Sequence, residues 1–426
     1  MYGVVESATR DELRDIQSDR LRNMVETAAG VPFYQQAFEE AGITAEDVES
    51  VEDIDKLPFT TKEDLRDNYP DKLFAVPRVD IVRLHASSGT TGKPKIVAYT
   101  RDDLDVWREV MARSLNAAGV SANDTVQNAY GYGLFTGGLG FHDGAEELGA
   151  TVIPIGGGNT DRQIDFLQDL GSTVLSCTPS YCLYLAEALE ERDVDPRDLP
   201  LSTVVIGAEP FTDPMRAEIE DALDVTAIDV YGLSEIVGPG VSIECAEAQD
   251  GLHVWEDYFY PEVVNPETGE VLDEGEEGEL VLTTLSKQAM PVLRYRTGDI
   301  TSLNYDECEC GRTHVRMDNV TGRVDDLLIV RGVNVYPSQI EEAMLEFAEA
   351  APHYRIDLRR EGTLDTIELT VEHHADAENV EELREKIHEK LNSTLDVSLD
   401  ELHVVEPGTI ERTTVGKVKR VFDHRE

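Results

Sequence analysis

Apolar residues recur at helical spacing in the first part of the chain. In the stretch RDELRDIQSDRLRNMVETAA, residues 10–29, apolar positions three to five residues apart line one face of a helix. These positions are Leu13, Ile16, Leu21, Met24 and Val25. We predict that the first eighty residues are mainly helical and cover a larger domain.

From about Ile81 onward, short β-branched runs alternate with helical stretches. Examples are IVAYT at 96–100, TVIPIGG at 151–157 and TVLSCTP at 173–179, each followed by a helix-like segment. Such alternation is typical of a mostly parallel sheet with helices packed on its faces. In open sheets of this class, ligands bind at the carboxyl ends of strands, so polar residues at those ends are the first candidates for a site.

The character of the chain changes twice after about residue 240. Residues 241–303 are rich in turns and poor in helix, which predicts an antiparallel sheet or a distorted β-barrel. The region of about 100 residues that follows has the mixture of elements and the length of a separate α+β domain. We therefore predict an α/β protein with a large N-terminal domain, residues 1–324, and a small C-terminal domain, residues 325–426.

Composition limits the class of protein. Of the 426 residues, 41% are apolar, which is enough for two or three domains with hydrophobic cores. No apolar run reaches the roughly 18 to 20 residues of a membrane helix, and the N-terminus lacks a basic segment followed by an apolar one. We predict a cytoplasmic protein with no membrane partner. The five cysteines, an odd number, argue against a disulfide framework.

The chain is strongly acidic. Its net charge is −49, because 86 acidic residues outnumber 37 basic ones. Acidic residues are spread along the whole chain and would repel a nucleic-acid backbone over most of the surface, which excludes nucleic acid as a partner. The charge density resembles that of proteins from organisms with molar intracellular salt, where screening shortens the repulsion to about 3 Å. We interpret it as adaptation to a halophilic, archaeal host; an acidic mesophilic protein is the alternative.

The stretch SSGTTGKPK at residues 87–95 combines hydroxyls, glycines and lysines. It is not a Walker A loop, since Ser87 stands where that motif has its first glycine and Pro94 where it has a serine or threonine. Pro94 also removes an N–H donor where a phosphate-binding helix would begin. We predict a strand–loop–strand hairpin that wraps a polyphosphate, with an ordinary polar turn as the alternative. The predicted phosphate contacts are Ser87, Ser88, Gly89, Thr90, Thr91, Gly92 and Lys93.

Four residues form a second candidate site: Cys245, His253, Cys308 and Cys310. The first two lie eight residues apart, and the other two share a glycine turn about fifty-five residues downstream. Thiolates and an imidazole suit a tetrahedral zinc site. We predict a structural Zn²⁺ here, with His314 as a competing fourth ligand and unligated buried thiols as the alternative. Cys177 and Cys182 are predicted core residues.

Five motifs occur in a characteristic order along the chain. They are SSGTTGKPK at 87–95, YGLSE at 231–235, YRTGD at 295–299, GRVDD at 322–326 and GKVKR at 416–420. Their order and spacing resemble those of the acyl-adenylate-forming enzymes, the superfamily of the acyl-CoA synthetases. Within it, the stretches VPFYQQAFEEAG and AYGYGLFTGGLGFHDGAEELGATVIP look like the phenylacetate-CoA ligase family.

The resemblance implies an enzyme that activates an aryl or arylacetic acid with ATP to an acyl-adenylate and transfers the acyl group to CoA, releasing AMP and pyrophosphate. It also implies Mg²⁺ as a cofactor. Dimers are frequent among the proteins that the chain resembles, so a homodimer stays open, and the sequence does not fix the oligomeric state. Two alternatives stay open: an adenylyltransferase of the coenzyme F390 synthetase type, which does not use CoA, and a non-catalytic nucleotide-binding protein. Retention of Lys417, Glu235 and Asp299 argues against the latter, because a sensor needs no mobile cation.

The same resemblance implies roles for single residues. Glu235 would hold Mg²⁺, for which a carboxylate at a strand end is a suitable ligand. Asp299 would accept the ribose hydroxyls, and Asp325 would mark a hinge between the domains. The other implied nucleotide contacts are Gly207, Ala208, Glu209, Pro210, Ser234, Arg323 and Tyr231, the last by stacking on adenine.

Lys417 lies in a locally basic tail. The last sixteen residues carry five basic and three acidic side chains, so this segment can approach an anion that the rest of the surface repels. The resemblance implies that Lys417 enters the site for adenylation and leaves when the small domain rotates for thioester formation. A solvated basic tail is the alternative.

The stretch AYGYGLFTGG at 129–138 places aromatic side chains among glycines, where the backbone can lie close to a flat ligand. The stretch IVGPG after Glu235 supplies an opposite wall. We predict a pocket for an aryl acid, with plain core packing as the alternative. The predicted lining residues are Tyr130, Tyr132, Phe135, Ile236 and Pro239.

Overall fold

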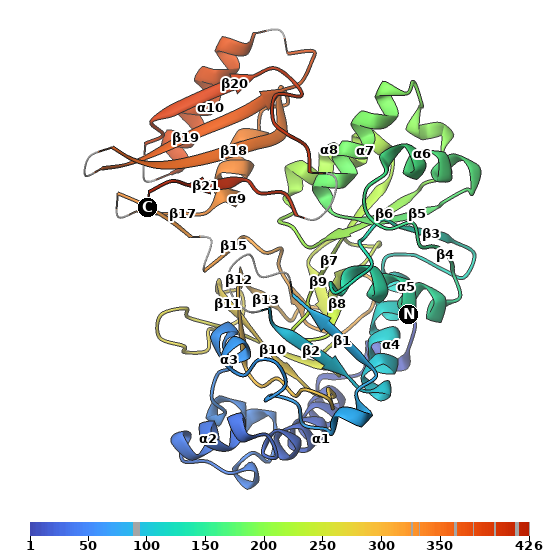
Figure 1. Cartoon of the computed structure of the whole chain (residues 1–426), viewed down its shortest axis with the longest axis vertical. Coiled ribbons are helices and arrows are strands. Elements are labelled where there is room, and N and C mark those ends of the chain that lie inside the picture. Colours follow the sequence, from blue (N-terminus) through green and yellow to red (C-terminus); the bar gives the residue numbers. More distant parts are fainter. Residues whose placement is uncertain are drawn as a thin grey trace. The chain divides into compact units, whose positions relative to one another are not determined.

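The computed structural model describes residues 1–87, 94–324, 327–331, 333–361, 364–377, 379–395, 398–413 and 417–425. The chain, drawn in Figure 1, divides into two compact units. The first comprises Met1–Cys177, Leu199–Ala208 and Thr226–Asp318, and the second Thr178–Asp198, Glu209–Val225 and Asn319–Glu426. The predicted hinge at Asp325 lies outside the described residues, so the boundary at this position stays a prediction.

A mixed sheet of nine strands runs through the first unit, in the order β13–β14–β9–β8–β7–β6–β5–β3–β4. The bounds are β3 Thr125–Asn128, β4 Thr151–Ile153, β5 Val174–Cys177, β6 Thr203–Gly207, β7 Thr226–Leu233, β8 Gly238–Glu244, β9 Leu252–Val254, β13 Leu303–Asn304 and β14 Arg316–Met317. Strands β4, β3, β5, β6 and β7 pair in parallel, whereas the pairs from β7–β8 to β14–β13 are antiparallel. The predicted parallel pairing is thus confirmed for the half of this sheet that contains β4, β3, β5, β6 and β7.

Helices precede and connect the strands of the first unit, as the spacing of apolar residues predicts. The α-helices are α1 Arg10–Ala28, α2 Pro32–Ala41, α3 Lys62–Asp67, α4 Arg101–Ala117, α5 Gly137–Leu148 and α6 Thr160–Asp169. Short 3-10 helices are Val4–Ser7, Ala45–Asp47, Val51–Lys56 and Arg78–Asp80. Helices α1 and α4 begin after Thr9 and Thr100, whose side chains accept a backbone N–H of the first turn. No helix in the described ranges is long and apolar enough to cross a bilayer.

The remaining strands of the first unit form a hairpin and a smaller sheet. The hairpin consists of β1 Arg83–Ala86 and β2 Ile96–Tyr99, and the sheet contains β10 Phe259–Val264, β11 Gly278–Thr284 and β12 Tyr295–Thr301. Both are antiparallel. Antiparallel pairing of residues 241–303 is therefore confirmed. The described strands do not close into a barrel, because β8 and β9 extend the nine-stranded sheet while β10, β11 and β12 pair separately.

The second unit contains a four-stranded sheet, in the order β20–β19–β18–β21. Its strands are β18 Ala350–Glu361, β19 Leu364–His373, β20 Glu401–Val405 and β21 Val421–Asp423. The helices of this unit are α7 Pro179–Glu191, α8 Asp213–Leu223, α9 Pro337–Leu345, α10 Val380–Thr394 and the 3-10 helix Pro196–Asp198. Its short strands are β15 Gly322–Arg323, β16 Leu328–Val330 and β17 Val333–Val335. Apolar residues of β18, β19, α9 and α10 form one core, which confirms the predicted α+β character.

Candidate active site and metal centre

The glycine-rich stretch connects the two strands of hairpin β1–β2. Ala86 pairs with Ile96, and the N–H of Ser87 donates to the carbonyl of Lys95 at 3.1 Å. The predicted strand–loop–strand form is therefore confirmed. The Ser87 hydroxyl is buried and has no hydrogen-bond partner among the described residues, as suits a contact to a phosphate oxygen. The other predicted phosphate contacts, Ser88, Gly89, Thr90, Thr91, Gly92 and Lys93, lie outside the described residues.

Glu235 follows strand β7 and meets the base of the hairpin. Its side chain is buried, at 5% exposure, and its carboxylate forms an ion pair with Lys95. Ser234 is also buried, and its hydroxyl lies 3.0 Å from that of Thr136. The structure thus brings Glu235, Ser234 and the hairpin together. The sequence predicts Lys93 as the lysine of this motif that acts on the phosphates, whereas the lysine that contacts Glu235 is Lys95.

A second lysine, which sequence reasoning missed, contacts the same turn. Lys287 is 5% exposed, and its Nζ donates to the Glu235 carbonyl at 2.8 Å. The Nζ atom lies 5.2 Å from the centre of the Tyr99 ring. Burial lowers the pKa of Lys287 to about 7, against the opposing charges of Asp103 and Glu235. The turn of Glu235 therefore has two lysines beside it, one at the carboxylate and one at the backbone.

Tyr231 and Asp299 lie in contact. The Tyr231 hydroxyl donates to Asp299 Oδ2 at 2.6 Å, and the N–H of Asp299 donates to the Thr297 hydroxyl at 3.0 Å. Asp299 is 6% exposed, while Tyr231 is half-buried in β7. The residues predicted for the adenine and the ribose are therefore adjacent, although they belong to strands β7 and β12 of different sheets.

Gly207 and Ala208 end strand β6. A Cβ atom on Gly207 would lie 2.1 Å from the Val230 carbonyl oxygen, so the close approach of β6 to β7 requires glycine here. Ala208 has a φ of +71°, in the left-handed region that non-glycine residues rarely adopt. Such backbone strain occurs preferentially at functional sites.

Other predicted site residues belong to the second unit. The Glu209 carboxylate accepts the N–H of Val418 at 2.8 Å and that of Ser180 at 3.2 Å. Val418 directly follows Lys417, so Glu209 contacts the backbone beside the predicted catalytic lysine. Lys417 and Pro210 are exposed, and Arg323 is half-buried.

The predicted acid-pocket residues differ in their surroundings. Tyr130 is buried, stacks on Phe141 with ring centroids 5.0 Å apart, and donates from its hydroxyl to the Cys177 carbonyl at 2.5 Å. These contacts are those of a core residue, the alternative interpretation. Tyr132 and Phe135 are each 37% exposed. Ile236 is buried and Pro239 half-buried, and the pocket role of all five stays a prediction.

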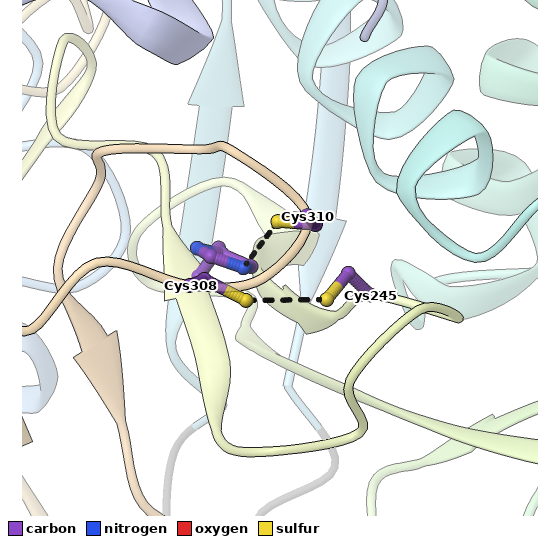
Figure 2. Close-up of side chains that lie close together, drawn as sticks. Cys245, Cys308 and Cys310 are labelled. Carbon is purple, nitrogen blue, oxygen red and sulfur yellow. Dashed lines mark hydrogen bonds between the residues drawn. The ribbon is translucent and has the colours of Figure 1, made fainter.

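The predicted zinc ligands lie together (Figure 2). The ligand atoms of Cys245, His253, Cys308 and Cys310 all lie within 4.8 Å of one another. The Sγ atoms of Cys245 and Cys308 are 3.6 Å apart, and Cys310 Sγ lies 3.4 Å from His253 Nε2. With Zn–S of about 2.3 Å and Zn–N of about 2.0 Å, tetrahedral ligand atoms lie about 3.5 to 3.8 Å apart. Burial raises the pKa of the Cys245 thiol to about 12, and a bound cation would favour its thiolate form.

The two histidines near this cluster have different partners. His253 Nδ1 lies 3.4 Å from the His314 carbonyl oxygen, and an N–H there leaves Nε2 as a lone pair toward the cluster. His314 Nδ1 accepts the N–H of Glu256 at 2.9 Å, and its Nε2 donates to the Val5 carbonyl at 3.1 Å. Both ring nitrogens of His314 therefore have backbone partners, so His314 does not compete as the fourth ligand. Cys177 and Cys182 are buried, as predicted.

Comparisons with known proteins agree with this geometry. Residues 15–288 match the family described as AMP-binding enzyme, and residues 332–425 match the AMP-binding enzyme C-terminal domain. The chain is 50% identical to a phenylacetate-coenzyme A ligase of Thermus thermophilus, over 99% of this chain and 98% of that protein. It is 48% identical to the phenylacetate-coenzyme A ligase of Escherichia coli, over 99% of this chain and 97% of that protein.

Solved structures give the same result. A 2-hydroxyisobutyryl-CoA ligase in the postadenylation state, in complex with 2-HIB-AMP, has a TM-score of 0.92 and 29% identity, over 99% of this chain and 91% of that one. The same ligase with 2-HIB-AMP and CoA in the thioesterification state has a TM-score of 0.73 and 30% identity at the same coverage. On the full-length sequence matches and the shared fold, the chain belongs to the AMP-binding enzymes, in the family of the phenylacetate-coenzyme A ligases.

Proposed function

We propose that this chain activates an aryl or arylacetic acid, phenylacetate first among them, with ATP to an acyl-adenylate, and then transfers the acyl group to CoA. The products are the acyl-CoA, AMP and pyrophosphate. The observation that carries the proposal is the ion pair between Glu235 and Lys95, which puts the predicted Mg²⁺ ligand at the base of the hairpin. The order of the five motifs, which resembles that of adenylate-forming enzymes, also supports it. The choice of acid is supported by the names of the relatives that are 48 to 50% identical over the whole chain.

Adenylation joins two anions, so the site must neutralise charge and align the carboxylate for attack on the α-phosphorus. We assign the hairpin hydroxyls, backbone N–H groups and Lys93 to the phosphates, and Glu235 to Mg²⁺ with Ser234 beside it. When bound, Mg²⁺ would neutralise phosphate charge. The buried Glu235 fits such an ion, because its carboxylate lies at the base of the predicted phosphate-binding hairpin, where it pairs with Lys95.

The nucleoside part of ATP fits the pair of Tyr231 and Asp299. Tyr231 would stack on adenine through its ring, while its hydroxyl holds one oxygen of the ribose acceptor Asp299. Gly207 and Ala208 end the neighbouring strand and, with Glu209 and Pro210, would line the other side of the base. Arg323 is assigned to the ribose or phosphate.

Lys417 is assigned to the adenylation step, where its ammonium bridges the acyl carboxylate and the α-phosphate. We propose that it leaves the site for thioester formation when the C-terminal domain rotates about a hinge at Asp325. The structures of the 2-hydroxyisobutyryl-CoA ligase in a postadenylation and a thioesterification state support two states in a relative. The basic surroundings of Lys417 suit approach to an anion.

The experiment is acid-dependent exchange of labelled pyrophosphate into ATP, across a panel of aryl, arylacetic and short aliphatic acids, followed by CoA addition. We expect exchange with arylacetic acids and CoA-dependent consumption of the acyl-adenylate. Exchange without any reaction with CoA would favour the alternative adenylyltransferase. Nucleotide binding without exchange would favour the non-catalytic alternative, and exchange with aliphatic acids alone would contradict the proposed substrate class.

We further propose that Cys245, His253, Cys308 and Cys310 hold a structural Zn²⁺, which would join the turn after β8 to the loop before β14. The test is metal analysis of dialysed protein for wild type and for Cys245→Ser. Cys182→Ser is the matched control, because that thiol is equally buried but lies outside the cluster. We expect about one zinc per chain in wild type and control and a loss in Cys245→Ser. Wild-type protein without zinc would contradict the proposal.

We also infer that the protein works in molar salt. The net charge of −49 makes carboxylate repulsion large at low ionic strength, and screening shortens its range from about 10 Å at 0.1 M to about 3 Å at 1 M. We expect the unfolding temperature to rise steeply between 0.1 and 3 M KCl. A protein equally stable and active at both concentrations would contradict the inference.

A further inference from the structure

Lys287 places a buried amine in contact with the predicted magnesium ligand. It lies in the loop between β11 and β12, is 5% exposed, and donates from Nζ to the Glu235 carbonyl at 2.8 Å. The Nζ atom also lies 5.2 Å from the centre of the Tyr99 ring, whose face attracts cations. A buried ammonium is costly unless polar or negative groups compensate it. The negative charges that act on it are those of Asp103 and Glu235.

Asp103 is occupied by backbone contacts. Its carboxylate accepts the N–H of Gln288 at 2.6 Å and that of Ala289 at 2.9 Å. Both residues directly follow Lys287, so Asp103 fixes the loop that carries the ammonium. The only direct hydrogen bond of Lys287 Nζ among the described residues goes to the Glu235 carbonyl. The geometry therefore directs the buried amine at the turn of Glu235.

Tyr99 also holds this turn. Its hydroxyl donates to the Val237 carbonyl at 2.8 Å, and its ring stacks on Trp107 with centroids 5.2 Å apart. Lys287 and Tyr99 thus hold the carbonyls of Glu235 and Val237, two residues apart in one turn. Because the carbonyl and the carboxylate of Glu235 belong to one residue, fixing its peptide group fixes the position from which the carboxylate extends.

We propose that Lys287 is a positioning residue for adenylation: its amine holds the Glu235 peptide group and so fixes the position from which the carboxylate would reach Mg²⁺. The inference rests on the proposed function, because it assigns Lys287 to the site at which Glu235 and the triphosphate meet. Partners that hold a metal-binding side chain from behind orient it and tune its affinity. Lys287 acts through Glu235 and does not touch the substrates.

Lys287→Met tests the proposal, because methionine keeps the length and the apolar stem but removes the charge and the donor. We expect the rate of pyrophosphate exchange to fall about tenfold to a hundredfold, and the Mg²⁺ concentration for half-maximal rate to rise. Thioester formation from a preformed acyl-adenylate should stay close to wild type. The unfolding temperature should fall only slightly, because the Glu235 carbonyl loses its donor while the cost of burying the lysine amine is removed. Lys56→Met, at an exposed lysine paired with Asp53, is the matched control and should change none of these values.

A parallel loss of both half-reactions together with a lower unfolding temperature would make Lys287 a purely structural residue and overturn the proposal. An unchanged Mg²⁺ dependence would overturn it as well. If Lys287→Met does not fold, Lys287→Gln is measured instead, since it keeps a donor but shortens the side chain. A selective loss of adenylation with a raised Mg²⁺ requirement supports the proposal, and a parallel loss of both half-reactions or an unchanged Mg²⁺ dependence contradicts it. Absence of exchange in the wild type with every acid would instead contradict the proposed function.

Discussion

Replacing Tyr231 by phenylalanine removes one hydrogen bond from the predicted ribose acceptor and keeps the aromatic ring. In the wild type, the Tyr231 hydroxyl donates to Asp299 Oδ2 at 2.6 Å, a short charge-assisted bond to a carboxylate that is only 6% exposed. The variant leaves this oxygen poorly solvated and lets the carboxylate turn away from the position that accepts the ribose. The ring face predicted to stack on adenine is unchanged, so the substitution separates the effect of the hydroxyl from that of the ring.

The expected magnitude follows from the bond that is lost. A hydrogen bond to a charged group contributes about 1.5 to 3 kcal/mol. With about 1.4 kcal/mol for each factor of ten, the KM for ATP in pyrophosphate exchange should rise about tenfold to a hundredfold. The KM for the acid should change little, because the acid pocket predicted from other residues does not involve this bond.

The assay is pyrophosphate exchange at varied ATP and saturating acid, with Tyr231→Leu beside Tyr231→Phe. Leucine removes both the ring and the hydroxyl, so it should raise the KM for ATP further than phenylalanine does. An ATP KM for Tyr231→Phe equal to that of wild type would refute the role of this hydrogen bond. Equal effects of both variants would refute stacking of adenine on the ring.

Two further predictions concern stability. Arg113→Met should lower the free energy of unfolding in urea by about 3 to 5 kcal/mol, because Arg113 donates to Asp257 at 2.7 Å and both side chains are buried. Adding Asp257→Leu should restore part of this loss, because the uncompensated charge is then removed. Additive losses in the double variant would contradict this account. Burial and the charges of Glu187 and Glu341 raise the pKa of Glu218 to about 8. A raised carboxyl pKa gives stability that is present below the ordinary pKa and is lost as the pH rises toward 8. Glu218→Gln should therefore raise the unfolding temperature at pH 8.5 but not at pH 4, and an equal effect at both would contradict the assignment.

Features with a local signature could be predicted from the sequence. The glycines and the proline at 87–95 predict the hairpin, and the β-branched run that becomes β5 predicts a strand of the parallel sheet. The metal cluster could be predicted because its ligand types are rare in this chain, which has five cysteines in all. These predictions need only the types of residue and their spacing.

Contacts between distant segments could not be predicted in the same way. Lys287 and Glu235 lie 52 residues apart, and no periodicity links them. Lysine side chains are also seldom fully buried, so the residue type gives no reason to expect Lys287 inside the site of Glu235. The many turn residues in 241–303 predict antiparallel pairing. They do not indicate that β8 pairs with β7 and extends the large sheet instead of forming part of a barrel.

The two histidines near the cysteines illustrate the same limit. His253 and His314 are equally good ligands by residue type, and both lie close to cysteines in the sequence. Backbone partners distinguish them: His314 is held by Glu256 and Val5, whereas His253 keeps Nε2 beside Cys310. Such partners are set by the fold around the loop and leave no local sequence signal.

The central claim is that one chain carries out adenylation and thioester formation with different residues in place, and Lys417→Ala tests it most directly. The two half-reactions are measured separately, as pyrophosphate exchange and as reaction of preformed acyl-adenylate with CoA. We predict that adenylation falls by about 10²- to 10³-fold, the cost of losing one transition-state donor, while thioester formation stays close to wild type. Equal losses in both half-reactions, or no loss in either, would contradict the account.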